Sequence, residues 1–287
     1  MLKLTHPLHL LLVALTYLLG ASVPAYLGKS FMLAPFALGL AFALLMQASM
    51  SFLREVFRPH HEPIMDGETP QKKETLRKNL LSVSAGMMGA STVIAFVAHL
   101  NFSLTSPTIL FLFSSLCLVL LYSIPPFHLV NRGFGELILA VHIAYVVPSI
   151  AFLFQTDETS SLLAALLLPL VALALACFLI QNFSTFPDDQ KYERGTLLRY
   201  LGWERAVPLH HNLIAFAYVS FAIVPLFGFA FGLVAPAFLT LPFAIFQVIQ
   251  FRAIANGFPP NWRLITFTAL AVFGLTAYFL TLTFWLR

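Results

Sequence analysis

The stretch YSIPPFHLVNRGFGE, residues 122–136, joins two long apolar segments of the chain. Its Pro-Pro pair stiffens the chain as it leaves the first segment, and its two glycines allow the chain to turn. Glu136 then places an acid at the start of the second segment. Because a helix N-terminus carries partial positive charge, we expect Glu136 to be either a partner of the helix dipole or a participant in chemistry.

Two further stretches, REVFRPHHE at 54–62 and FPDDQKYERG at 186–195, also follow long apolar segments. Only 10% of the chain is charged, yet charged residues gather in these stretches. Charge at the mouth of a membrane bundle is costly unless it meets water or a polar ligand. The three stretches together predict one site, and their chemistry suggests that the site handles a diphosphate.

The composition is that of a membrane protein. Hydrophobic residues make up 59% of the 287 positions, and the mean hydropathy is +0.86. A soluble domain would be about half apolar and about a quarter charged. Cys117 and Cys177 both lie inside apolar runs, so we expect two small core residues and no disulfide framework.

Apolar segments long enough to span a bilayer recur along the whole chain. A spanning helix needs roughly 20 mostly apolar residues. The sequence therefore predicts an all-α, polytopic membrane helical bundle, a single transmembrane domain over 1–287 with loops 54–79 and 183–206 as caps. About nine spans are expected, at approximately 6–28, 32–53, 80–101, 107–124, 134–154, 160–182, 207–228, 230–250 and 264–286.

The basic residues predict the orientation. With a cytosolic N-terminus, all but two of the 16 Lys and Arg residues lie on the cytosolic side, the exceptions being Lys29 and Arg287. This bias is the one that the positive-inside rule describes. We therefore expect an integral, multi-pass protein, in a cytoplasmic membrane of the bacterial type, with loops 54–79 and 183–206 facing the cytosol.

The first charged stretch combines acids and arginines. Glu55 and Glu62 suit Mg²⁺, a hard cation that prefers oxygen ligands, and Arg54 and Arg58 suit phosphate contacts. The alternative is a solvated helix end, in which Arg58 pairs locally with Glu55 and Glu62 at helical spacing.

The second charged stretch has the same two interpretations. Pro187 can begin a short helix, which would place Asp188 and Asp189 near its positive end. Asp189 and Glu193 would share a face that could hold a metal, with Lys191 and Arg194 available for phosphate. The alternative is that these acids only stabilise the N-terminus of the helix.

A few polar residues near the cytosolic ends of the spans, Gln47, Gln181 and Asn182, are expected either to line the pocket or to form interhelical hydrogen bonds. The chain also holds 30 Phe, 8 Tyr and 3 Trp. Aromatic rings around a central cavity would suit an isoprenoid tail and could stabilise an allylic cation by cation–π contact.

These features resemble the UbiA superfamily of membrane prenyltransferases. The resemblance covers the nine-helix layout, the run YSIPP…RGFGE and the run FPDDQKYERGTLLRYLG. The family's first motif, Asn-Asp-x-x-Asp-x-x-x-Asp, falls on Arg54, Glu55, Arg58 and Glu62. Its second, Asp-x-x-x-Asp, becomes Asp189 followed by Glu193, whereas a start at Asp188 would end at Tyr192.

The resemblance implies a Mg²⁺-dependent enzyme of quinone biosynthesis or a related route, which moves a polyprenyl group from a prenyl diphosphate to an aromatic or quinone-precursor acceptor. Its partners would be these two substrates and membrane lipid, with no nucleic acid. It assigns catalysis to Asp188, Asp189 and Tyr122. It assigns substrate binding to Arg54, Arg58, Lys191, Arg194, Asn182 and Gln47, and metal binding to Glu55, Glu62, Asp188, Asp189 and Glu193. The alternatives are a non-catalytic lipid-binding or scaffold protein on this fold, and an isoprenoid cyclase of the same superfamily.

Overall fold

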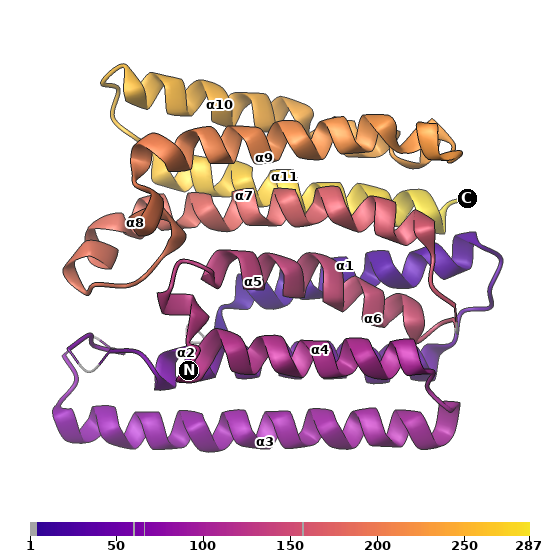
Figure 1. Ribbon diagram of the computed structural model, residues 1–287, viewed down its shortest axis with the longest axis horizontal. Helices are drawn as coiled ribbons and strands as arrows, with labels where there is room; N and C mark the ends of the chain where they lie inside the picture. Colours follow the sequence, from indigo (N-terminus) through magenta and orange to yellow (C-terminus); the bar gives the residue numbers. More distant parts are fainter. Residues whose placement is uncertain (1–4, 60, 66, 157) are drawn as a thin grey trace.

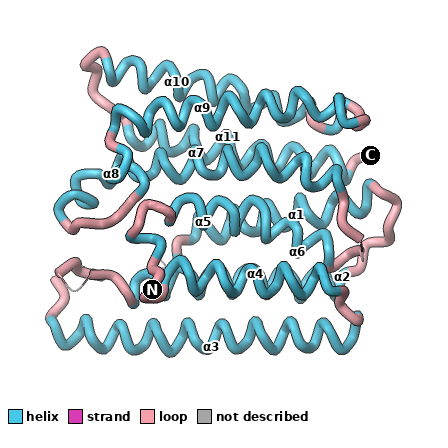
Figure 2. Tube along the Cα trace, in the orientation of Figure 1, coloured by secondary structure: helices cyan, strands magenta, loops and turns pink. Residues whose placement is uncertain are grey.

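The computed structural model describes residues 5–59, 61–65, 67–156 and 158–287. These ranges contain helices and no strand, and nine of their helical segments are long and apolar enough to cross a membrane (Figures 1 and 2). The prediction of an all-α, multi-pass membrane bundle is therefore confirmed. The long helices are α1 (Pro7–Tyr26), α2 (Leu33–Val56), α3 (Pro70–Phe102), α4 (Ser106–Ser123), α7 (Ser161–Lys191), α9 (Trp203–Ile223), α10 (Leu241–Ala255) and α11 (Trp262–Trp285).

The remaining span is composite. It runs over Gly135–Leu153 as α5 (Gly135–Val141), a π-helical turn η3 (His142–Val146) and α6 (Val147–Leu153). Short 3-10 segments extend two other spans, η4 (Val224–Phe227) after α9 and η6 (Ala235–Thr240) before α10. The span expected at 230–250 begins later because η5 (Phe231–Leu233) and its flanking turns occupy the connection.

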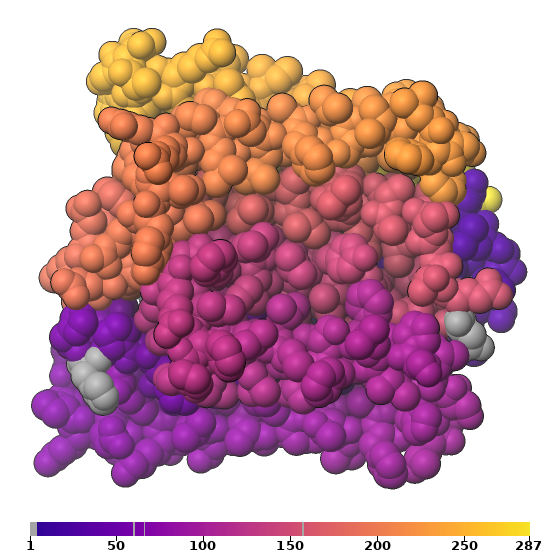
Figure 3. All heavy atoms as spheres, in the orientation of Figure 1, coloured from indigo at the N-terminus to yellow at the C-terminus, as the bar shows by residue number. Residues whose placement is uncertain are grey.

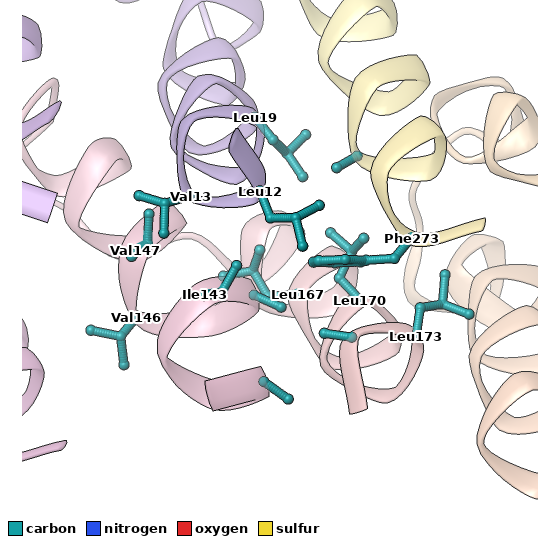
Figure 4. Packing of buried hydrophobic residues seen from close by; sticks show 14 of the residues in the cluster. Leu12, Val13, Leu19, Ile143, Val146, Val147, Leu167, Leu170, Leu173 and Phe273 are labelled. Carbon is teal, nitrogen blue, oxygen red and sulfur yellow. The ribbon is translucent and has the colours of Figure 1, made fainter. Parts of the chain in front are cut away.

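The core lies where α1, the α5–α6 span, α7 and α11 meet (Figure 4). Without water to drive helices together in lipid, close packing holds them, and small residues permit it. A Cβ atom on Gly20 of α1 would lie 2.0 Å from the carbonyl oxygen of Pro148 in α6, so these helices touch at their backbones. This contact fixes the centre of the bundle.

Helix α3 lies at one edge of the bundle and packs mainly on α2 (Figure 3). Its buried residues are few, and apolar side chains such as Val93, Phe96 and Leu100 remain more than half exposed. Such exposure is expected of a helix that faces lipid. The bundle centre is therefore formed by the other spans.

Two helix ends differ from the sequence expectation. Helix α3 begins at Pro70 instead of near residue 80, because the Thr69 side chain caps it and Pro70 occupies its first turn. The first turns of α3 are basic, so hydropathy identifies only the apolar part of the helix that follows them. The cap over residues 54–79 is therefore shorter than predicted, since most of the basic residues lie on α3.

The prediction that a short helix begins at Pro187 is wrong, because α7 continues through Pro187 to Lys191. Proline fixes a helical φ, and bundle helices tolerate it inside a span. Asp188 and Asp189 consequently lie in the last turn of α7, near the negative end of the helix dipole. The dipole does not stabilise their charge there, so other groups must do so.

Candidate functional site

The three charged stretches lie at the same end of the bundle, the end at which α2, α4 and α7 finish and α5 begins. They surround a partly open cavity with a volume of about 70 Å³. The polar residues that line it come from five different segments. They are His9, Arg54, Arg58, Glu62, Tyr122, His128, Asn131, Glu136, Gln181, Asn182, Arg194 and Thr196.

Arg194 joins the two acidic stretches. Its Nε and Nη2 atoms donate to Glu62 Oε1 at 2.9 and 2.5 Å, and its Nη1 donates to Asp189 Oδ1 at 3.0 Å. Glu62 and Arg194 are 132 positions apart in the chain. This contact brings the two acidic stretches together, as the sequence predicts for them.

The two neighbouring aspartates have different surroundings. Asp189 is buried, with 1% of its surface exposed, and its Oδ2 accepts hydrogen bonds from Thr185 and Thr196, both at 3.3 Å. Asp188 is exposed. Glu193, with a positive φ of 54°, lines a separate surface pocket beside Arg199. The carboxylates of Asp189 and Glu193 therefore do not form the shared face that the helical spacing predicts.

Arg58 performs the same bridging role within the first stretch. Its Nη2 lies 2.5 Å from Glu55 Oε2 and its Nη1 lies 2.9 Å from Glu62 Oε1. The Glu55 contact is close but not aligned as a hydrogen bond. These are the local pairs that helical spacing predicts. The backbone of this stretch is also held from α3, because Arg77 donates to Arg58 O and Lys73 donates to Glu62 O.

Glu136 ties the start of α5 to a short helix, α8 (Leu197–Leu201). It accepts a hydrogen bond from the Asn182 side chain, and both of its oxygens accept from the Leu197 backbone N–H at 3.2 Å. Both interpretations of Glu136 therefore stay open, since it lies in the first turn of α5 and also lines the cavity. Asn182 lines the cavity too, as predicted for a substrate-binding residue.

Two predicted binding residues lie away from the cavity. Gln47 is buried between helices, where its Oε1 lies 3.1 Å from His142 Nδ1, and His142 Nε2 in turn lies 2.9 Å from Ser115 Oγ. Gln47 thus has the interhelical role that is usual for such residues. Lys191 is exposed, with its Nζ 4.9 Å from the ring centre of Tyr192.

Tyr122 and Arg54 interact inside the cavity. Tyr122 is buried and lies beside the Arg54 guanidinium in the lining, and the carboxylates of Glu55 and Glu136 lie near the same guanidinium. Arg58 and Arg194 bind carboxylates directly. In contrast, Arg54 forms no ion pair within 4.0 Å in the described part of the chain.

Two histidines in the lining were not predicted from the sequence. His9 lies edge-on to Phe178, with ring centres 5.4 Å apart. The sequence feature that could have identified His9 is its position as a polar residue inside an apolar span. His128 adopts a positive φ of 42° after the Pro-Pro turn, and it lies inside the 122–136 stretch although it was not singled out there. Burial, reinforced by the charge of Arg132, lowers the pKa of His128.

Gly195 brings the second stretch against the 122–136 stretch. Its carbonyl oxygen accepts from the Gly133 N–H at 2.7 Å, and a Cβ atom on Gly195 would lie 1.8 Å from Asn131 O. Asn131 O is a backbone atom, which cannot move aside as the end of a flexible side chain could. We therefore expect Gly195→Ala to destabilise the protein by about 1–3 kcal/mol, as overpacking does. Chemical unfolding in detergent measures this, with Gly86→Ala as the control.

Gly86 of α3 is a suitable control because neither Gly86 nor Gly195 has a positive φ, while a Cβ atom on Gly86 would meet nothing within 4 Å. Gly86→Ala should therefore lose no stability. Equal stability of Gly195→Ala and Gly86→Ala would contradict the close approach at Asn131.

Comparisons with known proteins agree with this fold. The family model described as the UbiA prenyltransferase family matches residues 13–267. No curated protein matches the sequence. A UbiA homolog from Archaeoglobus fulgidus bound to GPP and Mg²⁺ is similar in structure, with a TM-score of 0.59, 17% identity and 98% of each chain covered.

Two further solved structures show the same likeness. A UbiA homolog from Archaeoglobus fulgidus bound to DMAPP and Mg²⁺ has a TM-score of 0.58 and 17% identity, with 98% of each chain covered. The apo structure of a UbiA homolog from Aeropyrum pernix K1 has a TM-score of 0.61 and 17% identity, with 96% of each chain covered. At these identities the likeness establishes a shared fold.

Proposed function

The chain belongs to the UbiA prenyltransferase family, and on that premise we propose that it moves a polyprenyl group from a prenyl diphosphate to an aromatic or quinone-precursor acceptor. The observation that supports this most is the Arg194 bridge between Glu62 and Asp189 at the mouth of the cavity. It brings the two acidic stretches together where three guanidinium groups face a common space. Such groups suit a diphosphate.

The proposed reaction follows from the lining. The bond between the first prenyl carbon and the diphosphate oxygen breaks, and its electron pair leaves with the diphosphate, whose growing charge the guanidinium groups stabilise. The rings of Tyr122 and Phe178 line the cavity and would stabilise the allylic cation. The acceptor carbon then bonds to the cation and loses a proton, which the His9 imidazole in the same lining can accept.

Mg²⁺ is present in the two ligand-bound relatives from Archaeoglobus fulgidus, and the resemblance predicts it here. The donors of this chain fit it poorly. Glu62 Oε1 accepts from Arg194 and lies 2.9 Å from Arg58 Nη1, and Asp189 uses both of its oxygens. The oxygens of Glu55 accept no hydrogen bond, but they lie against Arg58 outside the cavity lining. Within the described ranges, no three His, Cys, Asp or Glu groups come together as a metal site. No step of the proposed reaction is assigned to the metal.

The test is a product assay. Purified protein is incubated with Mg²⁺, a set of prenyl diphosphates and a set of aromatic acceptors, and mass spectrometry identifies the products. We expect a prenylated acceptor. A hydrocarbon that forms without any acceptor would instead identify the cyclase alternative. No product and no bound diphosphate would contradict the transferase proposal and favour the non-catalytic alternative.

The proposed orientation has its own test. With nine spans and a cytosolic N-terminus, the site faces the cytosol of a bacterial-type cell and the C-terminus lies outside. Reporter fusions before Met1 and after Arg287 should therefore report opposite sides of the membrane. The control is a fusion within residues 67–69, in the cap next to α3, which should report the same side as Met1. Termini that report the same side would contradict nine spans.

A further inference from the structure

The cavity presents three arginines to its interior, and two of the acids at the site lie behind them, outside the lining. Arg54, Arg58 and Arg194 line the cavity, whereas Glu55 and Asp189 do not. Each of these two acids lies against an arginine that does, at 2.5 Å for Glu55 with Arg58 and 3.0 Å for Asp189 with Arg194. The acids therefore orient the guanidinium groups, and the guanidinium groups meet the ligand.

We propose that these three arginines hold the diphosphate in place of magnesium, so that this chain binds a prenyl diphosphate without a divalent metal. This inference rests on the proposed function, since it concerns how the same substrate is bound. It goes beyond that function because it departs from the metal that the ligand-bound relatives contain.

The first support is that two of the acids, Glu62 and Asp189, are already engaged. Glu62 is 1% exposed, and its Oε1 lies within 2.9 Å of both Arg58 and Arg194. Asp189 is equally buried and accepts from Arg194, Thr185 and Thr196. Mg²⁺ requires short, near-octahedral oxygen contacts. A metal here would first have to displace the guanidinium groups from these oxygens.

The second support is that the arginines keep donors for a ligand. A guanidinium group has five N–H donors in a fixed plane. Arg194 directs three donors, from its Nε, Nη1 and Nη2, to carboxylates. Arg54 forms no ion pair within 4.0 Å with any described carboxylate, and its side chain lies beside Tyr122 in the lining. Arg54 is therefore the cation best placed to bind an incoming anion.

The third support is the charge that the substitutions supply. Where the family pattern has Asn and Asp, this chain has Arg54 and Arg58. Asn to Arg adds one positive charge, and Asp to Arg adds two. This gain is comparable to the charge of a bound Mg²⁺ ion. Arginine also binds phosphate oxygens in pairs, so it supplies geometry as well as charge.

The experiment compares binding with and without metal. Purified full-length protein in detergent is titrated with geranyl diphosphate by calorimetry, once with Mg²⁺ and once with excess EDTA. We expect the two dissociation constants to agree within about twofold, because the arginine contacts do not need the metal. Inorganic pyrophosphate should compete in both conditions, which distinguishes a diphosphate site from a site for a lipid tail.

A matched pair of variants identifies the groups responsible. Arg54→Gln should weaken binding in EDTA by roughly ten- to a hundredfold, which is the loss of one charged hydrogen-bonding partner. It breaks no ion pair within 4.0 Å among the described residues, so the fold should be retained. Arg263→Gln removes an exposed arginine at the start of α11 and should bind like the wild type.

The outcomes separate the two proposals. Binding that falls more than about tenfold in EDTA would overturn the metal-free inference and leave the proposed function standing. Equal binding by Arg54→Gln and Arg263→Gln in EDTA would show that Arg54 does not hold the diphosphate, and would also overturn the inference. No binding by the wild type in either condition would overturn the proposed function itself.

Discussion

Replacing Arg194 by glutamine is expected to destabilise the protein by about 3–5 kcal/mol, the usual cost of removing one partner from a buried ion pair. Two carboxylates, those of Glu62 and Asp189, would each lose a charged partner while 99% buried (1% exposed). Because the Arg194 side chain is itself 19% exposed, water can partly replace it, and we expect the lower half of that range. The measurement is urea unfolding in detergent, followed by circular dichroism.

The control for this prediction is Lys191→Gln. Lys191 has the same charge, lies three positions away and is exposed. Its replacement should change the unfolding free energy by no more than about 0.5 kcal/mol, as surface substitutions usually do. If Arg194→Gln and Lys191→Gln unfold at the same urea concentration, the bridge between the two acidic stretches does not contribute to stability.

The second large effect is expected at Asp189. Asp189→Ala removes the carboxylate that holds Arg194 Nη1 and the hydroxyl groups of Thr185 and Thr196. Arg194 then loses one of the two anchors that aim it at the cavity. We expect prenyl diphosphate binding to weaken by about 2–5 kcal/mol, as in other hydrogen-bonded charge pairs. Titration with geranyl diphosphate measures the loss.

The neighbouring Asp188→Ala variant is the matched control. Asp188 is exposed and does not line the cavity, so its replacement should leave binding within about 0.5 kcal/mol of the wild type. Sequence alone assigns the same roles to both aspartates. If Asp188→Ala and Asp189→Ala lose binding equally, the ligand contacts the outer face of α7, and the cavity is not the site.

Much of the fold is predictable because membrane insertion is a local property. Whether a segment spans depends on the summed hydropathy of roughly 20 consecutive residues. For the same reason the predicted helix boundaries are wrong where the end of a helix is made of charged residues. The first turns of α3 and the last turn of α7 are helical but polar, so hydropathy places them in loops. Thr69 and Pro70 signal the earlier start of α3 through capping chemistry.

The candidate site was only partly predictable. Arg58, Glu62 and Arg194 are apparent from charge in an otherwise apolar chain, and they do line the cavity. Gln47 is as polar as Asn182 and as close to a helix end, yet one binds His142 and the other lines the cavity. Which way each side chain points depends on the rotation of its helix in the bundle, and a single sequence does not contain that rotation.

The sequence by itself determined that this chain is a multi-pass helical membrane protein with its charge gathered in three stretches. Local hydropathy and composition are sufficient for that conclusion. The tertiary structure alone decided that Arg194 binds Glu62 across 132 positions, that Asp189 is buried while Asp188 is exposed, and that His128 enters the lining. An ion pair requires two groups within about 4 Å. Only the packing of the helices places distant residues that close together.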